Sequence, residues 1–267
     1  MSKSSEVKST IANAEIHEGW AKNYRNTENE VFFEIAFNEI ANTLNAPNGS
    51  SVLDAGCGSC RHSPRLAKHG MQVTAVDYSE YIVKKAKESI EIQGLSDSIS
   101  VKQEDLLNFS FPNESFNFVL CWGVLMHIPS VEEAIAEVSR VLKPGGIIVL
   151  SEVNMNSIEV KLTETLRPIL RKKNVVSKKT YAGIENWAET DSGRLLSRKV
   201  DVKWLEKEFK KHGLYIVERR AGQLTEAYTR FKNPIVRKFI HSINNFWFKK
   251  IRLAGPAFGN IIFLKKE

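Results

Sequence analysis

The chain has 267 residues, and 42% of them are hydrophobic, so it can bury a sizeable core as one large domain or one domain with an insertion. Three cysteines argue against a disulfide framework, and no apolar run reaches the ~18 residues that span a membrane. The polar N-terminus does not resemble a secretory signal, so we expect a cytoplasmic protein.

The net charge of +7 is unevenly distributed along the chain. Residues 1–155 carry 13 Lys and Arg against 20 Asp and Glu, a net −7, whereas residues 156–267 carry 25 against 11, a net +14. This excess suggests that the second part meets an anionic partner such as a phosphate, an acidic lipid or a nucleic acid. A solvated face that only keeps the protein soluble is the alternative.

Hydrophobic patterning predicts alternating strands and helices up to residue 150. Residues 1–12 are polar, and we expect them to be mobile, whereas residues 15–44 follow a helical pattern. The expected strands end at residues 53, 76, 101, 121 and 150, and the expected helices cover 61–69, 81–92 and 131–142. Such alternation predicts a parallel sheet with helices on both faces.

The regular alternation stops after Glu152 for about fifty positions, which is long for a connection. A helix is then expected over 201–212, a sixth strand over 214–217 and a final strand over 258–264. We therefore predict one domain over 1–267, a ligand-binding core over 15–152, and insertions over 153–200 and 221–257 that cover the binding site.

A glycine loop follows the first expected strand. Asp54 closes the strand, and Gly56 and Gly58 make a turn in which a ligand can approach the backbone near a helix N-terminus. Cys57 and Cys60, with His62 nearby, resemble half of a metal motif. No second cysteine pair exists, so the glycine turn explains the segment better, and we predict no metal.

Polar or aromatic residues also follow the next three strands, where ligands of open parallel sheets bind. Asp77 lies 23 positions after Asp54, so its carboxylate can accept both hydroxyls of a ribose. Asp105 can accept an adenine amino group, with flat apolar contact from Tyr78 and Leu106. We expect a nucleoside ligand, although Asp77 and Asp105 could instead cap the next elements. Trp122, after the fourth strand, joins the expected cofactor-binding set.

Two nucleoside cofactors compete for this site. A dinucleotide prefers G-x-G-x-x-G, but here Arg61 stands at the third glycine position. The carboxylate of Asp54 also suits a cation better than a pyrophosphate. A ligand with an amino group and a sulfonium therefore fits better than one with phosphates.

The motifs VLDAGCGSC, AVDYS, QEDLL and SRVLKPGGIIVLSE together resemble the class I S-adenosylmethionine-dependent methyltransferases. The resemblance covers roughly residues 15–155, and more loosely the region from 201 onward. It implies an α/β, doubly wound, seven-stranded sheet of order 3-2-1-4-5-7-6 with the last strand antiparallel. It also implies S-adenosyl-L-methionine as cofactor, which places the methionine part near Asp54, Gly56, Cys57 and Gly58, the ribose at Asp77, and the adenine at Asp105 and Leu106.

The same resemblance suggests that Tyr24 and Arg61 reach the cofactor carboxylate. The family often has glycine where this chain has Cys60, which leaves the shape of the loop open. His127, beyond the fourth strand, is the best candidate for a base that deprotonates the nucleophile, although it could simply be packed. Glu152, after the fifth strand, is an alternative.

The acceptor is less defined. Cys121-Trp122-Gly123-Val124 replaces the Asn/Asp-Pro-Pro-Tyr/Phe motif of amino-methylating nucleic acid enzymes, which argues against that group. We expect methyl transfer to an oxygen or nitrogen of a small molecule or glycan, which could be phosphorylated or lipid-linked. An RNA- or protein-modifying methyltransferase, a non-catalytic cofactor-binding partner protein and, more distantly, a dehydrogenase stay open.

Residues 232–252 form a basic, aromatic and partly amphipathic segment. Such a segment can lie on an anionic membrane, which would place the protein at the inner membrane surface. It could equally pack its aromatic residues on the edge of the sheet.

Overall fold

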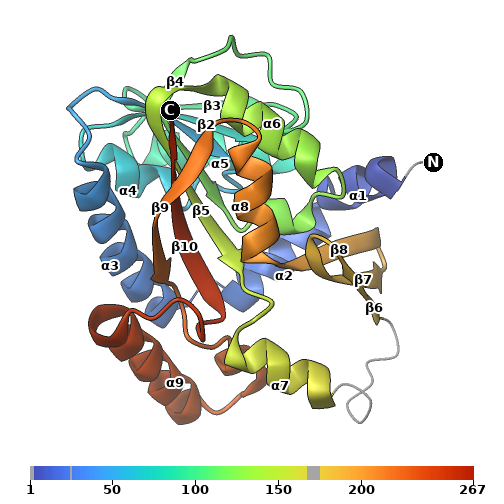
Figure 1. Ribbon diagram of the computed structural model, residues 1–267. Coiled ribbons are helices and arrows are strands. Elements are labelled where there is room, and N and C mark those ends of the chain that lie inside the picture. The colour runs from blue at the N-terminus through green and yellow to red at the C-terminus, as the bar shows by residue number, and fades with distance from the viewer. Residues whose placement is uncertain (1–2, 25, 167–174) are drawn as a thin grey trace.

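The computed structural model of the protein describes residues 3–24, 26–166 and 175–267. A seven-stranded sheet with helices on both sides forms its centre (Figure 1). The strand order is β3-β2-β1-β4-β5-β10-β9, and β10 runs antiparallel to both of its neighbours. This confirms the expected order, since β9 and β10 are the sixth and seventh strands of this sheet along the chain. The strands are β1 (Ser51–Ala55), β2 (Gln72–Asp77), β3 (Ile99–Gln103), β4 (Phe116–Trp122), β5 (Leu142–Val153), β9 (Leu214–Ala221) and β10 (Gly259–Lys266).

Two apolar layers cover the sheet, as its buried strands require. One layer packs the helices α3 (Thr27–Leu44), α4 (Ser63–Ala67) and α5 (Glu80–Ile92) against one face. The other packs α6 (Val131–Val141) and α8 (Val202–Lys210) against the opposite face. Both helix layers are needed because β1 and β4 are buried on both sides.

The N-terminus differs from the expectation of a mobile segment. Residues 3–11 form α1 (Lys3–Ile11), in which Val7 is buried, and this helix lies against β8 of a second sheet. The expected helical region 15–44 is divided into α2 (Ala14–Tyr24) and α3. Asn26 separates them as the N-cap of α3, because its side chain accepts a hydrogen bond from the backbone of Asn29.

The region after Glu152 is also more regular than the sequence suggests. It contains α7 (Ile158–Leu166) and an antiparallel sheet of β6 (Val175–Thr180), β7 (Gly183–Thr190) and β8 (Gly193–Val200). Residues 167–174 of the expected insertion lie outside the described residues. The second insertion contains the 3₁₀ helix η2 (Ala227–Arg230), α9 (Pro234–Phe246) and the π-helical turn η3 (Trp247–Ile251). Figure 1 shows α7 and α9 below the end of the large sheet at which β5 finishes.

One buried cation joins the small sheet to the large one. Arg198 of β8 pairs with Glu185 of β7 at 3.0 Å. Its guanidinium also donates to the carbonyl oxygens of Leu125 and Ile128, the first residue and the C-cap of the 3₁₀ helix η1 (Leu125–His127) beyond β4. Arg198 therefore fixes the position of His127 relative to β8.

We predict that Arg198→Ala lowers the free energy of unfolding by about 3–5 kcal/mol, because one carboxylate and two carbonyl oxygens lose their buried partner. Chemical denaturation monitored by circular dichroism measures this loss. The control is Arg194→Ala on the same strand, whose partner Glu189 is exposed and whose loss should cost under about 1 kcal/mol. Equal losses for the two variants would contradict the anchoring role.

Candidate functional site

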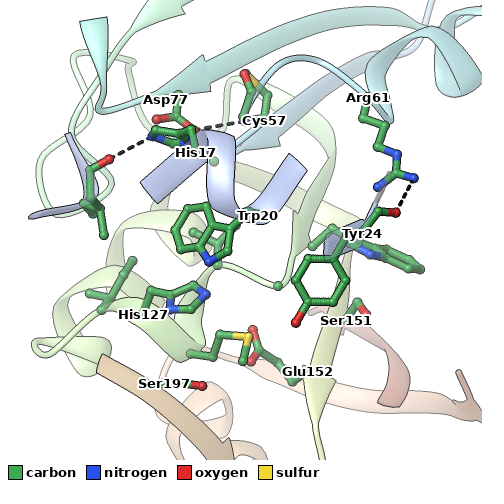
Figure 2. Close-up of a pocket in the computed structure, with 18 of the residues that line it drawn as sticks. His17, Trp20, Tyr24, Cys57, Arg61, Asp77, His127, Ser151, Glu152 and Ser197 are labelled. Carbon is green, nitrogen blue, oxygen red and sulfur yellow. Dashed lines mark hydrogen bonds between the residues drawn. The ribbon is translucent and has the colours of Figure 1, made fainter. Parts of the chain in front are cut away.

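A cavity of about 810 Å³ lies where the carboxyl ends of the parallel strands meet (Figure 2). The twelve residues expected at the site come from six separate stretches of the chain, and all twelve line this cavity. They are Tyr24, Asp54, Gly56, Cys57, Gly58, Arg61, Asp77, Tyr78, Asp105, Leu106, Trp122 and His127. The fold thus brings the whole set together, whereas the ligand contact of each residue stays a prediction.

The loop after β1 can only be built with glycine at one position. Gly56 has φ +78°, and a Cβ there would lie 2.5 Å from Cγ2 of Val124. The backbone N–H groups of Gly56 and Cys57 both donate to the carbonyl of Val76 at 2.8 Å. The loop is therefore tied to the end of β2, and it brings the backbone of Gly58 to the carboxylate of Asp77.

Cys60 occupies the position where a glycine is often found in the family, and it keeps the conformation that a glycine would adopt. Its φ is +54°, in the left-handed region, and its N–H donates to the carbonyl of Cys57 at 3.0 Å. The loop thus makes its turn without the missing glycine. His62, the third member of the half metal motif, stacks on the ring of Phe37 at 4.7 Å.

Asp54 is buried under this loop, with 2% of its surface exposed. Its Oδ2 accepts a hydrogen bond from the hydroxyl of Ser63 at 2.6 Å, at the start of α4. Burial raises the pKa of Asp54 to about 7, and the negative charge of nearby Asp77 adds to this effect. A cationic ligand in the cavity would therefore favour the ionised form of this carboxyl.

Asp77 is the last residue of β2, and each of its carboxylate oxygens accepts a hydrogen bond from a backbone N–H group. Oδ2 accepts the N–H of Gly58 and Oδ1 accepts the N–H of Ser79, each at 3.0 Å. Burial raises the pKa of Asp77 overall, although these hydrogen bonds and the nearby His17 act in the opposite direction. Figure 2 shows His17 beside Asp77 at the wall of the cavity.

Asp105 already has a cationic partner. Its Oδ2 pairs with the ammonium of Lys8 in α1, and its Oδ1 accepts the N–H of Leu107 at 3.0 Å. Lys8 also lies over the ring of Tyr78, 5.5 Å from the ring centroid. Recognition of an adenine amino group by Asp105 would thus require Lys8 to share or leave this carboxylate.

Tyr24 and Arg61 lie together on another wall (Figure 2). The guanidinium of Arg61 donates to the carbonyl oxygen of Tyr24 at 2.9 Å and to Glu30 at 2.8 Å. Burial and a hydrogen bond with Glu226 raise the pKa of the Tyr24 hydroxyl, which therefore stays protonated and can donate.

His127 is held in one orientation in η1. Its Nδ1 lies 2.7 Å from the carbonyl oxygen of Leu196, and a carbonyl only accepts, so Nδ1 carries a proton. Its ring packs on Trp20 of α2, with the centroids 4.9 Å apart. Burial lowers the pKa of His127, which favours the neutral imidazole with a lone pair on Nε2. Such a side chain can accept a proton.

Glu152, near the end of β5, is 3% exposed and also lines the cavity. It accepts a hydrogen bond from the backbone of Leu125, but its Oε1 has no partner within the described residues. Burial raises its pKa to about 8, so it is mostly protonated at neutral pH. Figure 2 shows Tyr24, His127, Glu152 and Ser197 around the same hollow.

Several lining residues were not foreseen. His17, Trp20 and Ala21 lie on one face of α2 with the expected Tyr24, a spacing visible in the sequence. Leu195, Ser197 and Lys199 line the cavity from β8, with the period of two of a strand. The pairing of Lys8 with Asp105 joins residues 97 positions apart, so no local sequence pattern predicts it.

Comparison with known proteins agrees with this geometry. Residues 53–150 match the family model of a methyltransferase domain. Sterol 24-C-methyltransferase ERG6B of Gibberella zeae is 37% identical over 120 residues, which is 45% of this chain and 32% of that protein. Ubiquinone biosynthesis O-methyltransferase of Coxiella burnetii is 36% identical over 108 residues, or 40% and 45% of the two chains. The matches thus span less than half of these curated relatives.

Solved structures share the fold over nearly the whole chain. The PH0226 protein of Pyrococcus horikoshii superposes with a TM-score of 0.66 at 17% identity, covering 96% of this chain and 100% of that one. Magnesium protoporphyrin IX methyltransferase of Synechocystis, solved with bound SAH, gives a TM-score of 0.65 at 15% identity, covering 97% and 98%. Residues 53–150 are thus similar to a methyltransferase domain, and the sheet has the strand order expected for a class I S-adenosylmethionine-dependent methyltransferase.

Proposed function

We propose that this protein transfers the methyl group of S-adenosyl-L-methionine to an oxygen or nitrogen of a small-molecule acceptor, with His127 as the base. The proposal rests on one observation: the same cavity is lined on one side by the expected cofactor-binding residues and on the other by a candidate base. Its one side presents Asp54, Asp77 and the glycine loop, and its other side presents an imidazole whose Nδ1 is already occupied. The family match supports the cofactor.

When bound, S-adenosylmethionine supplies an electrophilic methyl group on a sulfonium. The protein must then orient the acceptor, exclude water and remove one proton. Asp77 and the loop hold the cofactor side, and α1 and α2 cover it with Lys8, His17 and Trp20. His127 Nε2 accepts the proton of the acceptor hydroxyl or amine as the nucleophile bonds to the methyl carbon. The bound cofactor would supply the leaving group of this displacement, since its sulfur would keep the electron pair of its bond to the methyl carbon.

Most of the side chains that the two insertions contribute to the cavity are polar, which favours an acceptor with hydroxyl or phosphate groups. They include Asn186, Ser197, Lys199, Gln223, Glu226 and Arg230, which come from both insertions. We therefore propose that the segments 153–200 and 221–257 bind the acceptor, and that a glycan or a phosphorylated or lipid-linked molecule fits this wall best. One of the relatives above is named for a sterol and the other for ubiquinone biosynthesis, both small molecules.

Methyl-labelled S-adenosylmethionine, incubated with the protein and fractionated host extract, tests the activity. We expect label in a small-molecule fraction. Label in RNA or protein alone would refute the proposed acceptor class, and cofactor binding without any transfer would refute catalysis.

We predict that Asp77→Asn weakens the binding of S-adenosylmethionine at least tenfold, because the amide keeps the shape of the side chain but loses the charge that accepts two ribose hydroxyls. Isothermal titration calorimetry measures the affinity. Asp97→Asn, an exposed substitution at the opposite end of the strands, is the matched control and should leave the affinity unchanged. Wild-type affinity in Asp77→Asn would remove the ribose assignment.

The pKa of Asp54 predicts how cofactor affinity depends on pH. With a pKa raised to about 7, this carboxyl is mostly ionised at pH 8 and mostly neutral at pH 6. Affinity for the cationic cofactor should therefore fall as the pH drops below 7, approaching about tenfold per pH unit. Asp54→Asn should bind weakly with a flat profile over this range. A profile as steep as that of the wild type would assign the titration to another group.

We predict that His127→Gln reduces methyl transfer roughly 100-fold or more while cofactor affinity is kept, since the amide cannot take up the proton. Initial rates of label transfer into the acceptor fraction measure this effect, and calorimetry provides the affinity. Glu152→Gln serves as the comparison, because a mostly protonated Glu152 contributes less as a base at neutral pH. Full activity of His127→Gln together with loss in Glu152→Gln would transfer the role to Glu152.

A further inference from the structure

Helix α9 has its apolar side facing away from the protein. Ile235, Phe239, Ile243 and Phe246 form one stripe along the helix, and Ile235 and Phe239 are 78% and 66% exposed. The side that packs on the protein carries the polar residues His241 and Asn244 together with Ile240, and Asn244 is 1% exposed. A surface helix ordinarily buries its apolar stripe, so this arrangement indicates an apolar environment outside the protein.

Helix α7 shows the same pattern beside it (Figure 1). Ile158, Leu162 and Leu166 are exposed at a spacing of four residues, whereas Glu159 and Val160 are buried. The exposed stripes of both helices lie at the end of the large sheet where β5 finishes and β10 begins, since Val153 pairs with Gly259.

The two helices are held as one surface by the segment between β9 and α9. Glu159 of α7 accepts hydrogen bonds from the hydroxyl of Thr225 and the N–H of Glu226, and it pairs with Arg230. Asn244 of α9 bonds both the N–H and the carbonyl of the same Thr225, at 3.1 and 2.9 Å. Glu159 and Asn244 thus tie the two helices to the same linking segment, beside the buried Val160 and Ile240. The exposed apolar stripes lie on the other side of each helix.

Basic residues surround the stripe of α9. Residues 232–252 contain six Lys or Arg and no Asp or Glu. Lys232, Lys238, Lys249 and Lys250 are exposed, and within the described part of the chain none of the four forms an ion pair. Apolar side chains framed by cations match a bilayer surface, where the former enter the acyl boundary and the latter meet anionic headgroups.

We propose that α7 and α9 together dock the protein on the surface of an anionic phospholipid bilayer. A second copy of the chain is a poorer occupant, because a two-fold contact would bring the lysines of both copies together. Among the described residues, no helix is long and apolar enough to cross a bilayer, so the contact is peripheral.

The cavity opens next to this surface. Thr163 of α7 and Glu226 and Arg230 of the linking segment line the acceptor side of the cavity. An acceptor anchored in the bilayer could thus reach the cavity with its headgroup while its tail stays in the lipid. This role in presenting a lipid-linked acceptor rests on the proposed function, whereas the docking surface itself does not.

Vesicle flotation without cofactor tests the surface. We expect the wild type to float with vesicles that contain roughly one third phosphatidylglycerol, and to bind much less to pure phosphatidylcholine or at high salt. Phe239→Ser with Phe246→Ser should reduce the bound fraction about tenfold or more, as should Lys249→Glu with Lys250→Glu.

Matched controls lie on α5, at the other end of the sheet. Ile92→Ser removes a similarly exposed apolar side chain, and Lys84→Glu with Lys87→Glu makes the same charge change; both should float like the wild type. Calorimetry with S-adenosylmethionine confirms that each variant is folded and separates a failure of docking from a failure of the proposed function. Wild-type protein that binds the cofactor but does not float would overturn the proposal. So would a dimer that the Phe239 and Phe246 substitutions dissociate in the absence of vesicle binding.

Discussion

The parallel pairing of β1 with β2 and β4 forces the segments after these strands to leave the sheet at one edge. Asp54, Asp77 and Trp122 lie at or near the ends of these strands. The strand pairing alone therefore places these three residues at the same edge of the sheet. The glycine loop makes this arrangement tight, because Gly56 lets the backbone pass against Val124. Everything else at the site is arranged around that edge.

Burial at this edge changes the protonation of the carboxyl groups that line the cavity. Asp54 and Glu152 lie in the protein with few hydrogen bonds, and burial raises the pKa values of both. A charged carboxylate in such a place is costly unless a cation or donor meets it. Lys8 pairs with Asp105 and His17 lies near Asp77, so the N-terminal helices already bring basic side chains to two of the carboxylates. A cationic nucleoside would interact with the same groups.

Much of this could be predicted from the sequence, because the strand ends follow from hydrophobic runs and turns, and the resemblance to the class I methyltransferases implies the strand order. The small sheet could not, since β6 and β7 carry polar or charged residues on both faces and resemble a polar loop. Helix α1 was not predicted from the sequence for a related reason. Its residues are mostly polar, and its position depends on Val7 packing near β8 and on Lys8 pairing with Asp105, which are contacts between distant parts of the chain. The amphipathic character of 232–252 was visible, but only the structure shows which face of α9 points outward.

We expect the edge formed by β1, β2 and β4 to bind S-adenosylmethionine rather than a dinucleotide. Calorimetric titration of the protein with S-adenosylmethionine and, separately, with NAD distinguishes the two ligands. We expect saturable binding of S-adenosylmethionine at one site per chain and no detectable heat with NAD. Saturable binding of NAD, with none of S-adenosylmethionine, would show that this edge is a dinucleotide site.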